Sequence, residues 1–170
     1  MTEEEELYVD PAFFAALLPD LPGLEEARIR VKRGAARNEL SAFRYQAVLG
    51  PAAEGAPLAA ELHWSRDRLG LAALAARLED GTAPFAVEGI PNARLAAEAQ
   101  LLRWLQQPGE ATLEEWRRQP VPAGIEPEAL HALAARHGWA LELATTAGAP
   151  ARCAPCSTGA HRPPFPSPPG

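Results

Sequence analysis

The stretch that most constrains the fold runs from 27 to 49, where polar and apolar residues alternate in two arms. In the first arm, Ala27, Ile29 and Val31 alternate with basic residues, which is the period-two pattern of a half-buried strand. A similar alternation continues from Phe43 to Leu49, and both arms contain the β-branched and aromatic residues that favour strands. The connection is polar and holds the glycine and asparagine that a reversing backbone favours. The stretch therefore predicts an antiparallel hairpin with a long polar loop.

Basic residues are concentrated in this hairpin, although the net charge of the chain is −6. Six of the 16 lie here: Arg28, Arg30, Lys32, Arg33, Arg37 and Arg44. We expect Arg28, Arg30 and Lys32 to form a solvated face of the first strand, because charged side chains on one face of a hairpin usually point to water.

The length of 170 residues predicts one domain with enough chain to bury a core. The sequence contains no run of about 18 apolar residues, and it therefore does not suggest a membrane span. The first six residues are acidic, unlike a signal peptide, so we expect a cytoplasmic protein. The acidic balance, with an isoelectric point near 5.3, disfavours binding to nucleic acids or anionic membranes.

Periodicity and capping residues predict further elements around the hairpin. Asp10-Pro11 opens a helix whose Phe13, Phe14, Leu17 and Leu18 form an apolar stripe that we expect in the core. The other expected elements are a strand at Leu58–Trp64, a helix at Leu69–Leu78, a strand at Phe85–Ile90, a helix at 92–107, a short helix after the capping box Thr112–Glu115, a helix at Glu126–His137 closed by Gly138, and a strand at Trp139–Leu143. The alternation of strands and helices predicts the α/β class, a sheet covered by helices.

The last 27 residues, 144–170, differ in character from the rest of the chain. Seven are proline, and Phe165 is their only large apolar residue, so the segment predicts a disordered tail after a folded part at 1–143. Cys153-Ala-Pro-Cys156 and His161 resemble half of a zinc site, but zinc needs more ligands, and we expect no metal. Two explanations of the tail stay open: a natural linker, or a shifted reading frame in the coding DNA.

The second arm and the end of the loop also carry a resemblance. Asn38-Glu-Leu-Ser-Ala-Phe-Arg-Tyr-Gln-Ala-Val48 resembles the second core motif of N-methyltransferase domains embedded in nonribosomal peptide synthetases, whose pattern is Asn-Glu-Leu-Ser-x-Tyr-Arg-Tyr-x-Ala-Val. The one departure is Phe43, where the family has tyrosine. Segments at Asp10–Phe14, Lys32–Gly34 and Gly89–Leu95 are similar to flanking parts of the same domains, so the resemblance covers residues 3–143.

The resemblance implies the C-terminal part of a class I, Rossmann-like methyltransferase sheet, with its closing antiparallel hairpin and covering helices. The parent domain would use S-adenosylmethionine to methylate the amine of a carrier-bound aminoacyl group. The glycine-rich cofactor turn, which is the first family motif, is absent from this sequence. The third motif does not continue after Leu141-Glu142. We therefore expect the chain alone to be inactive and to bind no cofactor.

The candidate catalytic residues lie within the matched motif: Asn38, Glu39, Arg44 and Tyr45. The resemblance favours a role for Glu39 in accepting a hydrogen bond from the acceptor amine, for Asn38 in fixing the loop, and for Tyr45 in lining the pocket. The alternative is structural: Glu39 and Arg44 form an ion pair that holds the loop, and Tyr45 packs against the sheet.

Three functional hypotheses remain open. The first is a piece of a synthetase N-methyltransferase domain, whose partners would be the rest of the methyltransferase and adenylation domains and a peptidyl carrier protein. The second is a non-catalytic accessory or docking module of an assembly line. The third, a basic hairpin that binds RNA or DNA, ranks last because the hairpin lacks interleaved exposed aromatic residues.

Overall fold

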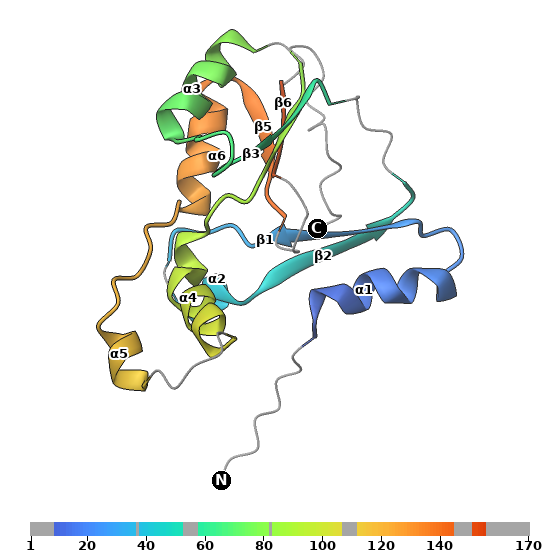
Figure 1. The fold of residues 1–170 in the computed structure, drawn as a ribbon. Coiled ribbons are helices and arrows are strands. Elements are labelled where there is room, and N and C mark those ends of the chain that lie inside the picture. The colour runs from blue at the N-terminus through green and yellow to red at the C-terminus, as the bar shows by residue number, and fades with distance from the viewer. Residues whose placement is uncertain are drawn as a thin grey trace.

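The structure is a computed structural model that describes residues 9–36, 38–52, 58–81, 83–106, 112–144 and 151–155, with only the backbone for 39, 40 and 151–155. The strands form a two-stranded and a four-stranded sheet (Figure 1). They are β1 (Glu26–Val31) and β2 (Tyr45–Gly50) in the first sheet, and β3 (Ala60–His63), β4 (Phe85–Glu88), β5 (Trp139–Glu142) and β6 (Ala151–Pro155) in the second. The helices are α1 (Pro11–Leu17), α2 (Glu39–Ala42), α3 (Leu71–Asp80), α4 (Ala96–Leu105), α5 (Leu113–Arg117) and α6 (Pro127–Arg136), with 3₁₀ turns η1 (Leu18–Asp20) and η2 (Ala93–Leu95).

The predicted hairpin is confirmed. β1 and β2 pair antiparallel, with Ile29 opposite Ala47 and Val31 opposite Tyr45. Ile29 is buried, at 5% exposure. The hairpin nevertheless differs from the expectation that it closes the main sheet. It forms a sheet of its own and meets the end of β5 through one main-chain hydrogen bond, from the Val31 amide to the Leu143 carbonyl at 2.9 Å, and one isolated bridge.

Helix α1 lies along the hairpin (Figure 1). Its start is the predicted one: the Asp10 carboxylate accepts a hydrogen bond from the Ala12 amide at 2.8 Å, and Pro11 takes the first helical position. The prediction that both phenylalanines are core is wrong for Phe13, which is 52% exposed. Phe14 is half-buried and meets the Tyr45 ring edge-on. A seven-residue helix on a two-stranded sheet is covered on one side only, which leaves the outer ring in water.

The four-stranded sheet has the order β3-β4-β6-β5. β3 and β4 are parallel and are joined through α3, which is a β–α–β unit, and β6 runs antiparallel to both of its neighbours. Phe85, Ala86 and Val87 of β4 are at most 1% exposed, as a central strand requires. The sheet with its covering helices agrees with the predicted α/β class.

The main core lies between this sheet and α3 and α6, which are neighbours in Figure 1. The Trp139 ring packs edge-on against Phe85, with centroids 5.4 Å apart, and its indole N–H donates to the Leu78 carbonyl at 2.8 Å. The other buried members are Leu74, Leu78, Val87, Leu130, Leu133, Ala134 and Leu143.

Helix ends follow the predicted capping residues. Thr112 and Glu115 form the capping box of α5, with the Glu115 carboxylate accepting from the Thr112 amide at 2.7 Å. Helix α6 ends before Gly138, whose φ of +73° is the left-handed conformation that favours glycine after a helix. None of the described helices is long and apolar enough to cross a membrane.

The prediction of a disordered tail is wrong for 151–155. This segment forms β6, which pairs with β4 on one side and β5 on the other. Strand pairing uses main-chain groups that almost any sequence supplies, so composition gave no indication of it. The rest of the predicted tail after Ala144 lies outside the described residues.

Two further expectations differ from the structure. The side chains of Arg28 and Arg30 are only 14% and 16% exposed, because each lies beside a carboxylate, Glu26 at 3.6 Å and Glu142 at 3.2 Å. They do not form the solvated face that we predicted. The helix expected at 92–107 begins as η2 and continues as α4, whose Leu102 and Leu105 are 56% and 64% exposed.

Candidate functional site

The motif that resembles the methyltransferase family folds as the last part of the hairpin loop, helix α2 and strand β2. Asn38 and Ser41 close the start of α2 reciprocally. The Asn38 carboxamide oxygen accepts from the Ser41 amide at 3.1 Å, and the Ser41 hydroxyl oxygen accepts from the Asn38 amide at 3.2 Å. The hydroxyl proton of Ser41 has two carbonyl acceptors, those of Ala36 and Asn38. The small polar residues of the motif thus give the loop its shape.

Tyr45 is the first residue of β2 and is half-buried. Its hydroxyl donates to the Val9 carbonyl, and its ring meets Phe14 with centroids 6.1 Å apart. Both ends of this side chain therefore contact the segment around the start of α1. Pocket lining and packing against the sheet both stay predictions for Tyr45.

The remaining candidates lie at the surface or outside the described side chains. Arg44 is exposed, and so is Phe43, at 55%. The side chain of Glu39 is not described, so its proposed bond to an acceptor amine and its proposed ion pair with Arg44 both stay predictions. The motif thus contains two kinds of residue: Asn38 and Ser41 shape the loop, and Phe43 and Arg44 lie exposed on its surface.

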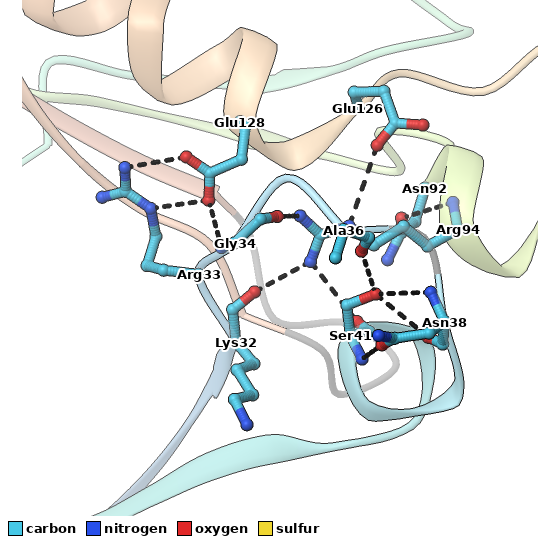
Figure 2. A network of polar contacts seen from close by, with 10 residues as sticks. All are labelled: Lys32, Arg33, Gly34, Ala36, Asn38, Ser41, Asn92, Arg94, Glu126 and Glu128. Carbon is cyan, nitrogen blue, oxygen red and sulfur yellow. Dashed lines mark hydrogen bonds and ion pairs between the residues drawn. The ribbon is translucent and has the colours of Figure 1, made fainter.

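Arg94 is the residue of this region that sequence reasoning missed. It lies in η2, which follows β4 along the chain, and is 8% exposed, yet its guanidinium reaches the loop (Figure 2). It donates to the carbonyls of Lys32 at 2.8 Å, of Ser41 at 3.3 Å and of Gly34. Because Gly89–Leu95 is similar to a flanking segment of the family, the arginine could have been singled out there.

Glu128 of α6 makes a second attachment of the loop (Figure 2). Its two carboxylate oxygens accept from Nε and Nη2 of Arg33, both at 2.9 Å, and one also accepts from the Gly34 amide at 2.8 Å. The Arg33 bonds, assisted by that amide, lower the pKa of Glu128 to about 2. The charged form of the Glu128 carboxylate therefore holds the loop against α6.

His131 lies one helical turn after Glu128 and is half-buried. Burial, with the nearby positive charge of Arg33, lowers the pKa of His131 to about 4. The imidazole is therefore neutral at neutral pH.

The described residues hold no group of three metal-ligating side chains. His63 accepts a hydrogen bond from the Arg66 amide at 3.3 Å through Nδ1. What this region offers chemically is positioning. A polar loop is fixed to the α/β unit by the hydrogen bonds of Arg94 to three carbonyls and by the ion pair of Arg33 with Glu128, and Phe43 and Arg44 are exposed on its surface.

The described connections that follow the two parallel strands contain few glycines. The connection from β3 to α3 carries one glycine, Gly70, at the N-cap of the helix. The connection from β4 to η2 carries Gly89, followed by Ile90 and Pro91. Neither is the glycine-rich turn that S-adenosylmethionine requires after a parallel strand.

Comparisons with known proteins find similarity between this chain and segments of nonribosomal peptide synthetases. No family model matches it. It is 38% identical over 156 residues to the chondramide synthase cmdD of Chondromyces crocatus, covering 86% of this chain and 4% of that protein. It is 36% identical over 155 residues to the nonribosomal peptide synthetase asqK of Emericella nidulans, covering 82% of this chain and 6% of that protein. It is 36% identical to the cyclosporin synthetase simA of Tolypocladium inflatum, covering 66% of this chain and 1% of that protein.

The chain is therefore homologous to a segment of nonribosomal peptide synthetases, and it spans only a few per cent of the length of the relatives it matches.

Proposed function

We propose that this chain is the C-terminal part of an N-methyltransferase domain of a nonribosomal peptide synthetase. The parent domain would transfer a methyl group from S-adenosylmethionine to the amine of an aminoacyl group on a peptidyl carrier protein. This chain would supply the loop on the acceptor side, and the missing part of the domain would supply the cofactor site. Its partners would then be the rest of the methyltransferase and adenylation domains, in the cytoplasm.

The observation that carries the proposal is how the motif is used. Asn38 and Ser41 shape the loop, while Phe43 and Arg44 are exposed. A large aromatic residue that is 55% exposed next to a cation contributes little to the core of this chain. The exposed Phe43 ring is therefore available to a surface outside this chain, either the missing part of the domain or the acceptor.

Two other observations support the proposal. The homology to synthetases spans most of the chain, including the region of the motif in the alignments that cover over four-fifths of it. The main sheet combines a parallel β–α–β unit with the antiparallel pair β5 and β6. A closing antiparallel pair beside parallel strands is what the resemblance implies for the end of a class I methyltransferase sheet, although it lies at β5 and β6 rather than at the hairpin.

A chimaera tests the proposal. The segment that immediately precedes the matched stretch in the chondramide synthase is fused to this chain, and the product is incubated with S-adenosylmethionine and a panel of aminoacyl pantetheine thioesters. We expect N-methylated products by mass spectrometry. The same segment with its own continuation is the positive control. A folded chimaera that binds the cofactor but methylates nothing, beside an active control, would show that this chain lacks the acceptor function.

A docking module is the second candidate, and one observation favours it. Leu102, Leu105, Leu113 and Val121 are 48–64% exposed around α4 and α5, which is more apolar surface than a solitary small domain needs. An accessory protein would bind an intact synthetase, and the methylation measured in the chimaera experiment would not depend on it. The same assay therefore separates the two functions.

A further inference from the structure

We propose that Arg94 is the positioning residue that holds the motif loop in place against the α/β unit. This inference rests on the proposed function, because the loop carries the candidate residues Asn38, Glu39 and Arg44. Arg94 would not touch the acceptor or the cofactor. It would act through the main chain of the loop.

The geometry of the guanidinium carries the argument (Figure 2). Its three acceptors lie at three separate points: Lys32 directly after β1, Gly34 in the loop, and Ser41 within α2. The guanidinium is planar and its donors have fixed directions, so bonding three carbonyls at once fixes their relative positions. Main-chain acceptors make this attachment independent of the side chains in the loop.

Arg94 is itself held by the α/β unit. Its amide donates to the Asn92 side chain at 3.0 Å, and its Nε lies 3.8 Å from a carboxylate oxygen of Glu126, the N-cap of α6. Asn92 also pairs with Ile125 in an isolated bridge. The hairpin belongs to a separate sheet, and among the described residues this arginine links the loop to the β–α–β unit beside the bonds of Glu128 to Arg33 and Gly34.

The burial of this cation indicates a specific role. A charged side chain is rarely buried unless it is paired and hydrogen-bonded, and Arg94 satisfies this by binding loop carbonyls. Arg33 and Glu128 attach the same loop from outside, where Arg33 is 63% exposed. The loop is therefore clamped from the inside by Arg94 and from the outside by Glu128.

Hydrogen exchange of the full chain tests the positioning directly. In Arg94→Gln, exchange of amides in 32–44 should rise about tenfold or more, because bonds from a charged donor to three carbonyls are lost. Exchange in β4 and α3 should change less than about twofold, and Arg94→Lys should lie between the two. Arg118→Gln, which removes an exposed arginine paired with Glu114, is the matched control and should leave 32–44 unchanged.

Two results would overturn the proposal. One is unchanged exchange in 32–44 in Arg94→Gln, and the other is an equal rise in β4 and α3, which would mean general destabilisation. Should Arg94→Gln fail to fold, Arg94→Lys is judged by the same criterion. If neither variant folds, Arg94 supports the whole fold rather than the loop, and the proposal is wrong.

The chimaera then separates this proposal from the proposed function. Arg94→Ala should methylate at least about tenfold more slowly per folded molecule, with the KM for S-adenosylmethionine unchanged, and millimolar guanidinium should restore part of the rate. Rescue by guanidinium is not expected for a general loss of stability. Suppose that hydrogen exchange in 32–44 rises in Arg94→Gln as described while even the unmutated chimaera is inactive. That result would support the role of Arg94 in holding the loop and would contradict the methyltransferase assignment.

Discussion

Protonation of Glu128 at low pH should weaken the attachment of the loop to α6. The Glu128 pKa of about 2 in the folded chain lies below the ordinary value of 4.5, because Arg33 and the Gly34 amide bind the charged form. The resulting stabilisation is present above about pH 4.5 and is lost as the pH falls through about 2. Since Arg33 is 63% exposed, we expect at most about 1 kcal/mol.

Glu128→Gln should therefore lower the free energy of unfolding at pH 7 and give a flatter pH dependence between about pH 4.5 and 2. Urea unfolding across this range is the measurement. Glu114→Gln, which removes an exposed carboxylate paired with Arg118, is the control. A Glu128→Gln profile parallel to the wild type would show that the Arg33 pair contributes nothing to the folded loop.

His131 should act in a different pH window. Its pKa is lowered from 6.5 to about 4 by burial and by Arg33, so the unfolded chain binds a proton that the folded chain does not between these values. Stability should therefore fall as the pH drops from 6.5 to 4 and should then cease to change on account of this group. His131→Gln should flatten this part of the profile, and an unchanged slope would contradict the burial of the imidazole.

At the scale of elements, the contact between 91–93 and 124–125 supports the region of Arg94. The Ile125 amide donates to the Pro91 carbonyl at 2.6 Å, and the Ala93 amide donates to the Ile125 carbonyl at 3.1 Å. A Cβ at Gly124 would lie 2.5 Å from main-chain atoms of Ala93, so these two segments pass each other only because residue 124 is glycine.

Gly124→Ala should consequently destabilise the chain by about 1–3 kcal/mol, the usual cost of forcing extra atoms into a packed site. Gly50→Ala is the matched control, because a Cβ there meets nothing within 4 Å. Urea midpoints of the two variants decide the matter. Equal urea midpoints for both variants would mean that the 91–93 and 124–125 segments can move apart without a loss of folding free energy.

Elements with local determinants were predictable from the sequence. The hairpin follows from its period-two pattern, α1 from Asp10-Pro11, and α5 from its capping box. Elements that depend on distant partners were not. β6 owes its strand conformation to β4 and β5. The acceptors of Arg94 lie 53 to 62 residues away along the chain, a separation at which no local pattern operates.

At the scale of the whole molecule, the main sheet has an edge that invites association. β3 is the last strand of the described sheet on its side, and it runs parallel to β4. Edge strands and exposed leucines such as Leu102 and Leu105 both favour contacts between chains. We expect the purified chain to form oligomers in sedimentation velocity at micromolar concentration. A cooperatively melting monomer would favour the docking-module function instead.

The coding DNA bears on the tail after Ala144. If the tail results from a shifted frame, another frame after about codon 144 should encode a strand that ends near Leu-Asp, followed by sequence of the adenylation type. If the other frames stop at once or encode nothing similar, 144–170 is a natural part of the protein. Sequencing of the gene with its downstream region distinguishes these outcomes.

Titration calorimetry with S-adenosylmethionine tests the central claim most directly, namely that this chain is the part of a methyltransferase domain without the cofactor site. The isolated chain should release no binding heat, because neither strand-to-helix connection of its parallel strands is a glycine-rich turn. The chimaera with the preceding synthase segment should bind with a Kd in the micromolar range, about −8 kcal/mol. Micromolar binding by the isolated chain would contradict the account.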